Sequence, residues 1–275
     1  MNRSGQMSSV PFKIAAVQMV STPDVRENLQ AAAELIAQAA GQGAKLIALP
    51  EYFCILGLRD LDKVAAREKD GEGPIQDFLA AAAARHGVWL VGGSVPMAIA
   101  DPGKVRNSCL VYDADGRRVA RYDKIHLFGL ALGEERFDEA RTIEPGDKPI
   151  AIDSPFGRIA VSICYDLRFP ELYRALAPVD IILVPSAFTA TTGKAHWEIL
   201  LRARAIENLA WVLAPAQGGR HANARETHGH SMIVDPWGGV QGCLPRGPGV
   251  VVAEVDPGFQ AKMRAGLPAL SHRVL

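Results

Sequence analysis

Apolar runs separated by polar turns recur along the chain and predict alternating strands and helices. The run at 13–19, KIAAVQM, is typical of a buried strand, and it precedes a helix for which Thr22 is the expected N-cap and Pro23 the first-turn proline. The apolar stripe of that helix falls at Val25, Leu29, Ala32, Ala33 and Ile36. Because a second apolar run, KLIALP at 45–50, follows, the chain begins as a β-α-β unit.

Later segments add further helices and strands in mixed directions. Asp115-Gly116 and the stretch 155–157 are typical of hairpin turns, so we expect antiparallel strand pairs beside parallel ones. The other expected elements are helices at 74–87, from Pro170 and at about 195–208, and strands at 88–95, 180–187, 211–217, 229–236, near 240 and at 249–256. The pattern predicts an α/β fold in one domain over 1–275, with a core at about 13–256 and a C-terminal tail at 257–275.

Composition and charge narrow the class of partner. Apolar residues make up 48% of the 275 positions, which suffices for a core, and 30 basic side chains balance 30 acidic ones. A neutral chain has no overall field to attract nucleic acid or an anionic membrane. No run reaches membrane-spanning length, and 1–13 has no apolar core of signal-peptide length. We therefore expect a cytoplasmic protein with a small-molecule partner.

Cysteines are few and scattered, but one occupies an informative place. Cys54, Cys109, Cys164 and Cys243 form no CxxC pair, which suits free thiols better than a disulfide framework. Cys164 ends an apolar run at the corner where a predicted strand gives way to a helix, and such corners face the ligand side of α/β sheets. It is either a nucleophile or an ordinary buried thiol.

A thiol nucleophile needs partners, because a free cysteine is mostly protonated at neutral pH. Glu51 follows the strand-like run LIALP and could take the thiol proton, protonate a leaving amine and activate water; otherwise it caps the next segment. Lys124, at the end of another strand, could stabilise thiolate and oxyanion; otherwise it is a surface lysine. Together the three residues suit acyl transfer from a carbon–nitrogen bond.

Three segments carry a family resemblance. LPEYF at 49–53, YDKIHLF at 122–128 and ICYDLRFPELYR at 163–174 resemble, in order and spacing, the signature segments of the nitrilase superfamily of carbon–nitrogen hydrolases. The resemblance runs from about Lys13 to Asp256. It implies an α-β-β-α four-layer sandwich with mixed sheets, commonly paired into a homodimer or a larger homo-oligomer, and we expect no cofactor.

The resemblance also implies roles for individual residues. Glu51, Lys124 and Cys164 match the family's triad: Cys164 would attack the amide carbon, Glu51 would move protons, and Lys124 with the backbone N–H of Tyr165 would hold the oxyanion.

Many members use a further glutamate before a Pro-Gly turn. Glu139 is the best match and Glu144 the alternative. The preceding segment at 128–136, FGLALGEER, departs from the Asp/Glu-Val-Pro-Gly sequence common in this branch, which puts the shape of that loop in question.

Segments at 185–208, 214–221 and 229–238 resemble the branch containing deaminated glutathione amidase and ω-amidase, and the last two are closer to the former. The implied substrate is a small carboxylated amide, with hydrolysis of deaminated glutathione to 2-oxoglutarate and cysteinylglycine as the leading hypothesis. The alternatives are ω-amidase activity on α-ketoglutaramate, another amidase or nitrilase, and a catalytically silent binding protein on the same fold.

Several residues are candidates for binding the carboxylates. Arg168 could clamp one bidentately or pair with Glu171 instead. Thr191, Thr192 and His196 fall at an expected helix start that could bind an anion, although Thr192 could simply cap the helix. Further candidates, in a glycine-rich turn, are Gln217, Arg220 and His221.

A zinc hydrolase is the main chemical alternative, because His221, His228 and His230 cluster in sequence. HExxH is absent and no close cysteine pair accompanies the histidines, so we expect no metal.

Overall fold

The computed structural model describes residues 10–274. Residues 1–9, part of the segment in which we expected no signal peptide, lie outside the described residues.

The helices are α1 (Val25–Gly41), α2 (Asp62–Ala65), α3 (Pro74–His86), α4 (Pro170–Leu176), α5 (Ala190–Asn208) and α6 (Pro257–Gly266), with 3-10 turns η1 (Glu139–Arg141) and η2 (Cys164–Arg168). The strands are β1 (Phe12–Gln18), β2 (Ala44–Ala48), β3 (Trp89–Val91), β4 (Val95–Ala98), β5 (Val105–Tyr112), β6 (Arg118–Asp123), β7 (Gly129–Leu132), β8 (Glu135–Asp138), β9 (Ile150–Ser154), β10 (Gly157–Val161), β11 (Ile181–Leu183), β12 (Trp211–Ala214), β13 (Ser231–Val234), β14 (Val240–Leu244) and β15 (Gly249–Val255).

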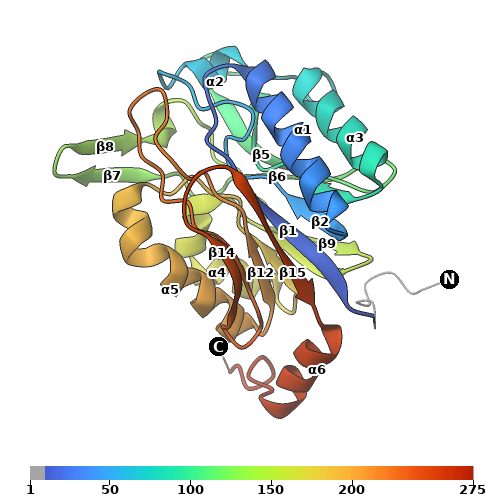
Figure 1. The fold of residues 1–275 in the computed structure, drawn as a ribbon. Helices are drawn as coiled ribbons and strands as arrows, with labels where there is room; N and C mark the ends of the chain where they lie inside the picture. Colours follow the sequence, from blue (N-terminus) through green and yellow to red (C-terminus); the bar gives the residue numbers. More distant parts are fainter. Residues whose placement is uncertain (1–9, 275) are drawn as a thin grey trace.

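Two mixed sheets form the centre of the molecule (Figure 1). One has the strand order β15-β1-β2-β3-β5-β4 with β6 paired to β5, and the other has the order β14-β13-β12-β11-β10-β9. β1, β2 and β3 run parallel, as do β10, β11 and β12. The hairpins expected around Asp115-Gly116 and 155–157 join β5 to β6 and β9 to β10, so the prediction of antiparallel pairs is confirmed.

The sequence of β1 shows why the layers stack. Ile14 and Ala16 point into the core between the two sheets, whereas Ala15 and Val17 point into a second core beneath α1 and α3. Because both faces of the strand are buried, its apolar residues run continuously instead of alternating. Helix α5 packs against β12 and β13 of the other sheet, so helices cover both sheets and the predicted α-β-β-α sandwich is confirmed (Figure 1).

Two helix starts differ from the prediction. The N-cap of α1 is Asp24, not Thr22, because the Asp24 carboxylate accepts from the backbone N–H groups of Arg26 and Glu27. The hydroxyl of Thr22 instead accepts from the backbone of Asp24. α5 begins at Ala190, five residues before the expected start, since Thr189 caps it.

The expected C-terminal tail contains a docked helix. In α6, Gln260 donates to the carbonyls of Leu209 and Asp180, and Arg264 pairs with the Asp180 carboxylate at 2.8 Å. These contacts fix α6 against the ends of β11 and β12. The β7–β8 hairpin, which projects at the left of Figure 1, was not expected from the sequence; it occupies the segment that departs from the branch pattern.

Candidate active site

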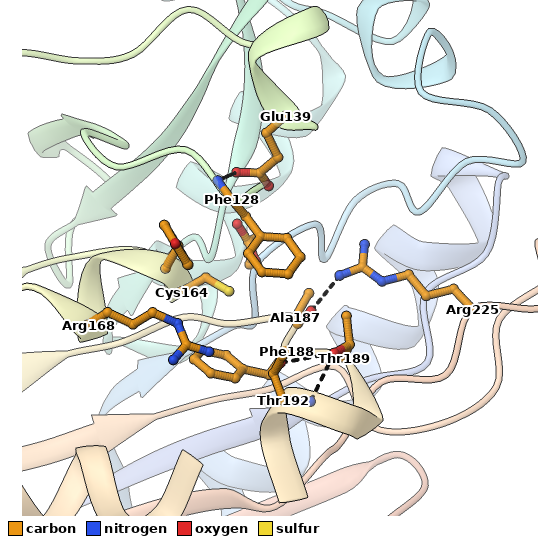
Figure 2. A pocket seen from close by; sticks show the side chains of 11 residues that line it. Phe128, Glu139, Cys164, Arg168, Ala187, Phe188, Thr189, Thr192 and Arg225 are labelled. Atoms are coloured by element: carbon orange, nitrogen blue, oxygen red, sulfur yellow. Dashed lines mark hydrogen bonds between the residues drawn. The ribbon is translucent and has the colours of Figure 1, made fainter. Parts of the chain in front are cut away.

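Cys164 lies at the corner after β10, at the start of η2. Its backbone φ is 50°, in the left-handed region, which is strained for any residue other than glycine. Its N–H donates to the carbonyl of Pro185 at 2.9 Å. The residue is 7% exposed, and it lines a small pocket into which its sulfur points (Figure 2). A strained turn therefore presents the thiol to a small cavity.

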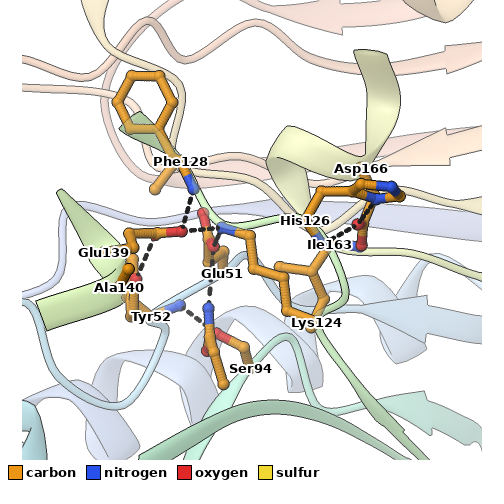
Figure 3. A network of polar contacts seen from close by, with 12 residues as sticks. Glu51, Tyr52, Ser94, Lys124, His126, Phe128, Glu139, Ala140, Ile163 and Asp166 are labelled. Carbon is orange, nitrogen blue, oxygen red and sulfur yellow. Dashed lines mark hydrogen bonds and ion pairs between the residues drawn. The ribbon is translucent and has the colours of Figure 1, made fainter. Parts of the chain in front are cut away.

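Asp166 connects this corner to the segment that carries Lys124. Its fully buried carboxylate accepts from the Ile163 N–H, the Tyr122 hydroxyl at 2.7 Å and the His126 N–H at 3.0 Å, and it lies 2.7 Å from the His126 ring (Figure 3). Tyr122 and His126 flank Lys124 by two residues on each side. Asp166 thus holds the thiol and the lysine in fixed relation, a role that was not predicted from the sequence.

Glu51, Lys124 and Glu139 form one buried charge network (Figure 3). The Lys124 ammonium lies 2.8 Å from a carboxylate oxygen of Glu51 and 2.8 Å from one of Glu139. Asn107 donates to the same Glu51 oxygen at 3.0 Å. Lys124 and Glu51 are each 1% exposed, which excludes the surface-lysine alternative.

Glu139, not Glu144, reaches this network. Besides Lys124, it accepts from the Tyr52 hydroxyl at 2.7 Å and from the backbone N–H of Phe128 at 2.7 Å. Glu144 instead pairs with Arg106 at 2.8 Å, away from the pocket.

The network explains the protonation of its members. Burial disfavours charge on Lys124, but the Glu139 and Glu51 carboxylates outweigh it and raise the lysine pKa above its usual value. Burial likewise opposes charge on Glu139, yet Lys124 holds the pKa of Glu139 below its usual value. Burial, followed by the negative charge of Glu51, raises the pKa of the Cys164 thiol, so the resting site carries a thiol.

Arg168 enters the same pocket from η2 (Figure 2). Its guanidinium lies over the rings of Tyr165 and Phe188, and it is 3.2 Å from the His196 ring. In the described chain it makes no ion pair with Glu171, so the alternative role in a salt bridge is wrong.

The two threonines predicted to bind a carboxylate, Thr191 and Thr192, differ in position. Thr192 lines the pocket, whereas Thr191 is exposed and donates to Glu135 at 3.2 Å. Thr189 caps α5, so the alternative that Thr192 is the cap is wrong. His196 is exposed and reaches the pocket only through Arg168.

The glycine-rich turn supports the site from outside the pocket. Gln217 is fully buried and donates to the carbonyl of Glu51 at 3.1 Å, which fixes the glutamate's backbone. His221 bridges the Ser21 carbonyl and the Thr227 hydroxyl, and Arg220 is exposed. These residues do not line the pocket.

Histidine clustering in sequence does not produce a metal centre. Within residues 10–274 no group of three His, Cys, Asp or Glu side chains could hold a metal ion. The His228 and His230 rings stack on each other, with centroids 4.1 Å apart.

One pocket residue, Arg225, had no place in the sequence analysis. It lies in the segment HANARETHGH at 221–230, and the residues nominated from the sequence were instead His221 and the preceding Arg220. Only the fold shows which of the two arginines turns inward.

Comparison with known proteins supports the family resemblance of the three motifs. Residues 13–265 match the family described as carbon-nitrogen hydrolase. The chain belongs to this family. Our carbon–nitrogen hydrolase is 43% identical over 272 residues to the deaminated glutathione amidase of Synechocystis sp., with 96% of this chain and 98% of that protein covered.

Solved structures of other carbon–nitrogen hydrolases share the fold. The Caenorhabditis elegans NitFhit protein gives a TM-score of 0.87 at 38% identity, covering 97% of this chain and 66% of that one. A glutamate-to-glutamine mutant of the amidase from Nesterenkonia sp. AN1 gives 0.76 at 27% identity, covering 94% of this chain and 98% of that one; its active-site cysteine has undergone Michael addition of acrylamide. None of the helices within residues 10–274 of our carbon–nitrogen hydrolase has the length and hydropathy of a membrane span.

Proposed function

We propose that this protein hydrolyses a small carboxylated amide through a thioester on Cys164, with deaminated glutathione as the preferred substrate. The observation that carries the proposal is the pocket itself: it brings Cys164 to Glu51 and Glu139 and adds an arginine beside the thiol. Identity to relatives named deaminated glutathione amidase supports the substrate.

The charges suggest an order of proton transfers. Two carboxylates share one ammonium, and burial together with the charge of Glu51 raises the pKa of the Cys164 thiol, so the reaction begins from the thiol. Glu51 takes the thiol proton as the sulfur attacks the amide carbon, and Lys124 with the Tyr165 N–H stabilises the oxyanion. Glu51 then protonates the departing amine. Water, deprotonated by Glu51, attacks the thioester, the C–S bond breaks to release the carboxylic acid, and Glu51 returns the proton to the Cys164 sulfur.

Glu139 acts through Lys124 in this scheme. Its hydrogen bonds to Tyr52 and Phe128 fix the carboxylate that in turn orients the ammonium. We therefore propose Glu139 as a positioning residue, with no proton transfer of its own.

In the proposed function, Arg168 and Thr192 bind the carboxylate on the acyl part of the substrate. In Arg168→Lys we expect kcat/KM to fall about 10- to 100-fold on deaminated glutathione and α-ketoglutaramate, because a lysine loses the bidentate fork. Steady-state kinetics with these two amides and with propionamide measure the effect, with Arg158→Lys on the exposed face of β10 as the matched control. An equal loss on propionamide would refute the clamp.

The same assay tests the proposed function. Preference of the wild-type protein for deaminated glutathione supports it, and preference for α-ketoglutaramate establishes the ω-amidase alternative. Lack of turnover of all three amides favours the silent binding protein.

We also propose that the whole chain is one domain, that the protein is cytoplasmic and that it forms a homodimer. The four cysteines are free, which suits a reducing compartment.

The dimer contact that we propose is an exposed apolar surface on α5 and the turn beside it. Ile199 and Ile206, 69% and 47% exposed, are two helical turns apart on α5, and the exposed Trp237 and Val240 follow in that turn.

Light scattering after size exclusion tests this dimer at about 50 µM protein. We expect twice the 29.5 kDa chain mass, and a monomer for Ile206→Asp because a charge enters the contact. Val119→Asp, at a partly exposed valine of β6, should stay dimeric. A monomeric wild-type protein would exclude the dimer.

A further inference from the structure

A second cleft adjoins the pocket at Cys164. It has a cavity volume of about 180 Å³, and Phe128, Glu139 and Arg225 line both spaces. Its far wall comes from α2 and the segment before it, including Lys63. A substrate longer than a primary amide therefore has room beyond the reacting carbon, on the side of Glu139 and Arg225.

Arg225 stands between the two spaces without an acidic partner. Its Nη2 donates to the carbonyl of Ala187 at 2.6 Å, and its guanidinium lies over the ring of Phe137. Its Nε is buried without a hydrogen-bond partner, and within residues 10–274 the side chain forms no ion pair. A buried guanidinium N–H left unsatisfied is costly, which indicates that an acceptor from outside the chain completes it.

Lys63 adds a second cation to the wall of the cleft. Its side chain is 15% exposed; its ammonium donates to Thr142 at 3.2 Å, and its nearest carboxylate, that of the exposed Asp60, is 3.8 Å away. Burial lowers the pKa of Lys63, and the charge of Arg225 contributes in the same direction, whereas the carboxylates of Asp60 and Glu139 oppose the shift. An anion between the two cations would offset their mutual repulsion.

The acidic residues of the cleft are already engaged. Glu139 is paired with Lys124, Asp138 accepts from the Ala140 N–H at the start of η1, and Asp60 faces solvent beside Lys63. None of these three carboxylates forms an ion pair with Arg225, so within the described residues its charge has no carboxylate partner.

We propose that Arg225 and Lys63 form a subsite for a carboxylate carried by the leaving amine. The inference rests on the proposed function, because it assumes that the acyl part of the substrate lies at Arg168 and Thr192. In Figure 2, Arg168 and Arg225 lie on opposite sides of Cys164, and only Arg225 continues into the second cleft. The leaving group is then a peptide-like amine with a terminal carboxylate, such as cysteinylglycine, and not ammonia.

Paired substrates test the subsite in Arg225→Gln and Lys63→Met. Deaminated glutathione has the leaving-group carboxylate, its C-terminal amide has the same leaving group without the charge, and α-ketoglutaramate has neither. We expect the loss of kcat/KM on deaminated glutathione, mainly in KM, to exceed the loss on the other two by about 10-fold or more in each variant. Arg220→Gln, at the exposed arginine of the same turn, is the matched control.

Equal losses on all three substrates would assign Arg225 and Lys63 a structural role and overturn the subsite. Binding of cysteinylglycine to the Cys164→Ala protein, measured by calorimetry, separates this result from failure of the proposed function. If the wild-type protein does not cleave deaminated glutathione, the proposed function is wrong. The subsite is then supported only if cysteinylglycine binds and Arg225→Gln weakens that binding about 10-fold; unchanged or absent binding overturns it.

Discussion

Replacing Cys164 by alanine should lower kcat for every amide substrate by about 10,000-fold or more, because the step that forms the thioester loses its nucleophile. Glu51, Lys124 and Glu139 keep their mutual contacts in this variant, since those contacts do not involve the sulfur. Product assay gives the rate, and intact-mass spectrometry of protein quenched during turnover should show an acyl adduct on the wild type only.

Cys54 provides the control for this experiment. It is fully buried, its thiol lies 3.6 Å from the carbonyl of Ser94, and burial raises its pKa. Cys54 does not line the pocket, so Cys54→Ala should keep its activity and its adduct. An adduct that persists in Cys164→Ala, or that maps to Cys54, would remove Cys164 as the nucleophile.

The fold was predictable because the strands of both sheets are continuous apolar runs with turn signals between them. The boundaries of the elements were less predictable, because they depend on single hydrogen bonds. The Asp24 side chain accepts from backbone N–H groups at the start of α1, and the Thr189 side chain accepts from one at the start of α5. α6 is anchored by Gln260 and Arg264, polar residues that a search for apolar stripes treats as surface.

Some residues of the site were predictable from the sequence and others were not. Glu51, Lys124 and Cys164 follow strand ends in recognisable motifs, so sequence alone nominates them. Asp166 and Arg225 act through partners distant in the chain, at Tyr122 and Ala187. An aspartate or arginine in a polar stretch looks the same whether it faces solvent or the interior, and only the assembled fold distinguishes these cases.

Lys124→Met should abolish activity and also destabilise the protein by about 3–5 kcal/mol at neutral pH, because it leaves two buried carboxylates facing each other without a counter-ion. The pH dependence gives the diagnostic result. In the wild type Lys124 holds the pKa of Glu139 low, so this glutamate contributes stability above the pKa it has when unfolded, and the contribution is lost as the pH falls through its folded value.

Without the ammonium, burial and the neighbouring Glu51 should raise the folded pKa of Glu139 above its unfolded value, and the sign reverses. The variant should then be most destabilised at about pH 7.5 and should recover part of the loss by about pH 5, as the carboxyl takes up a proton. Urea unfolding at the two pH values, alongside Lys148→Met at an exposed lysine, measures the difference. A Lys124→Met protein as stable as the wild type at the higher pH, or more strongly destabilised at the lower one, would contradict the assignment of Lys124 as the shared counter-ion of Glu51 and Glu139.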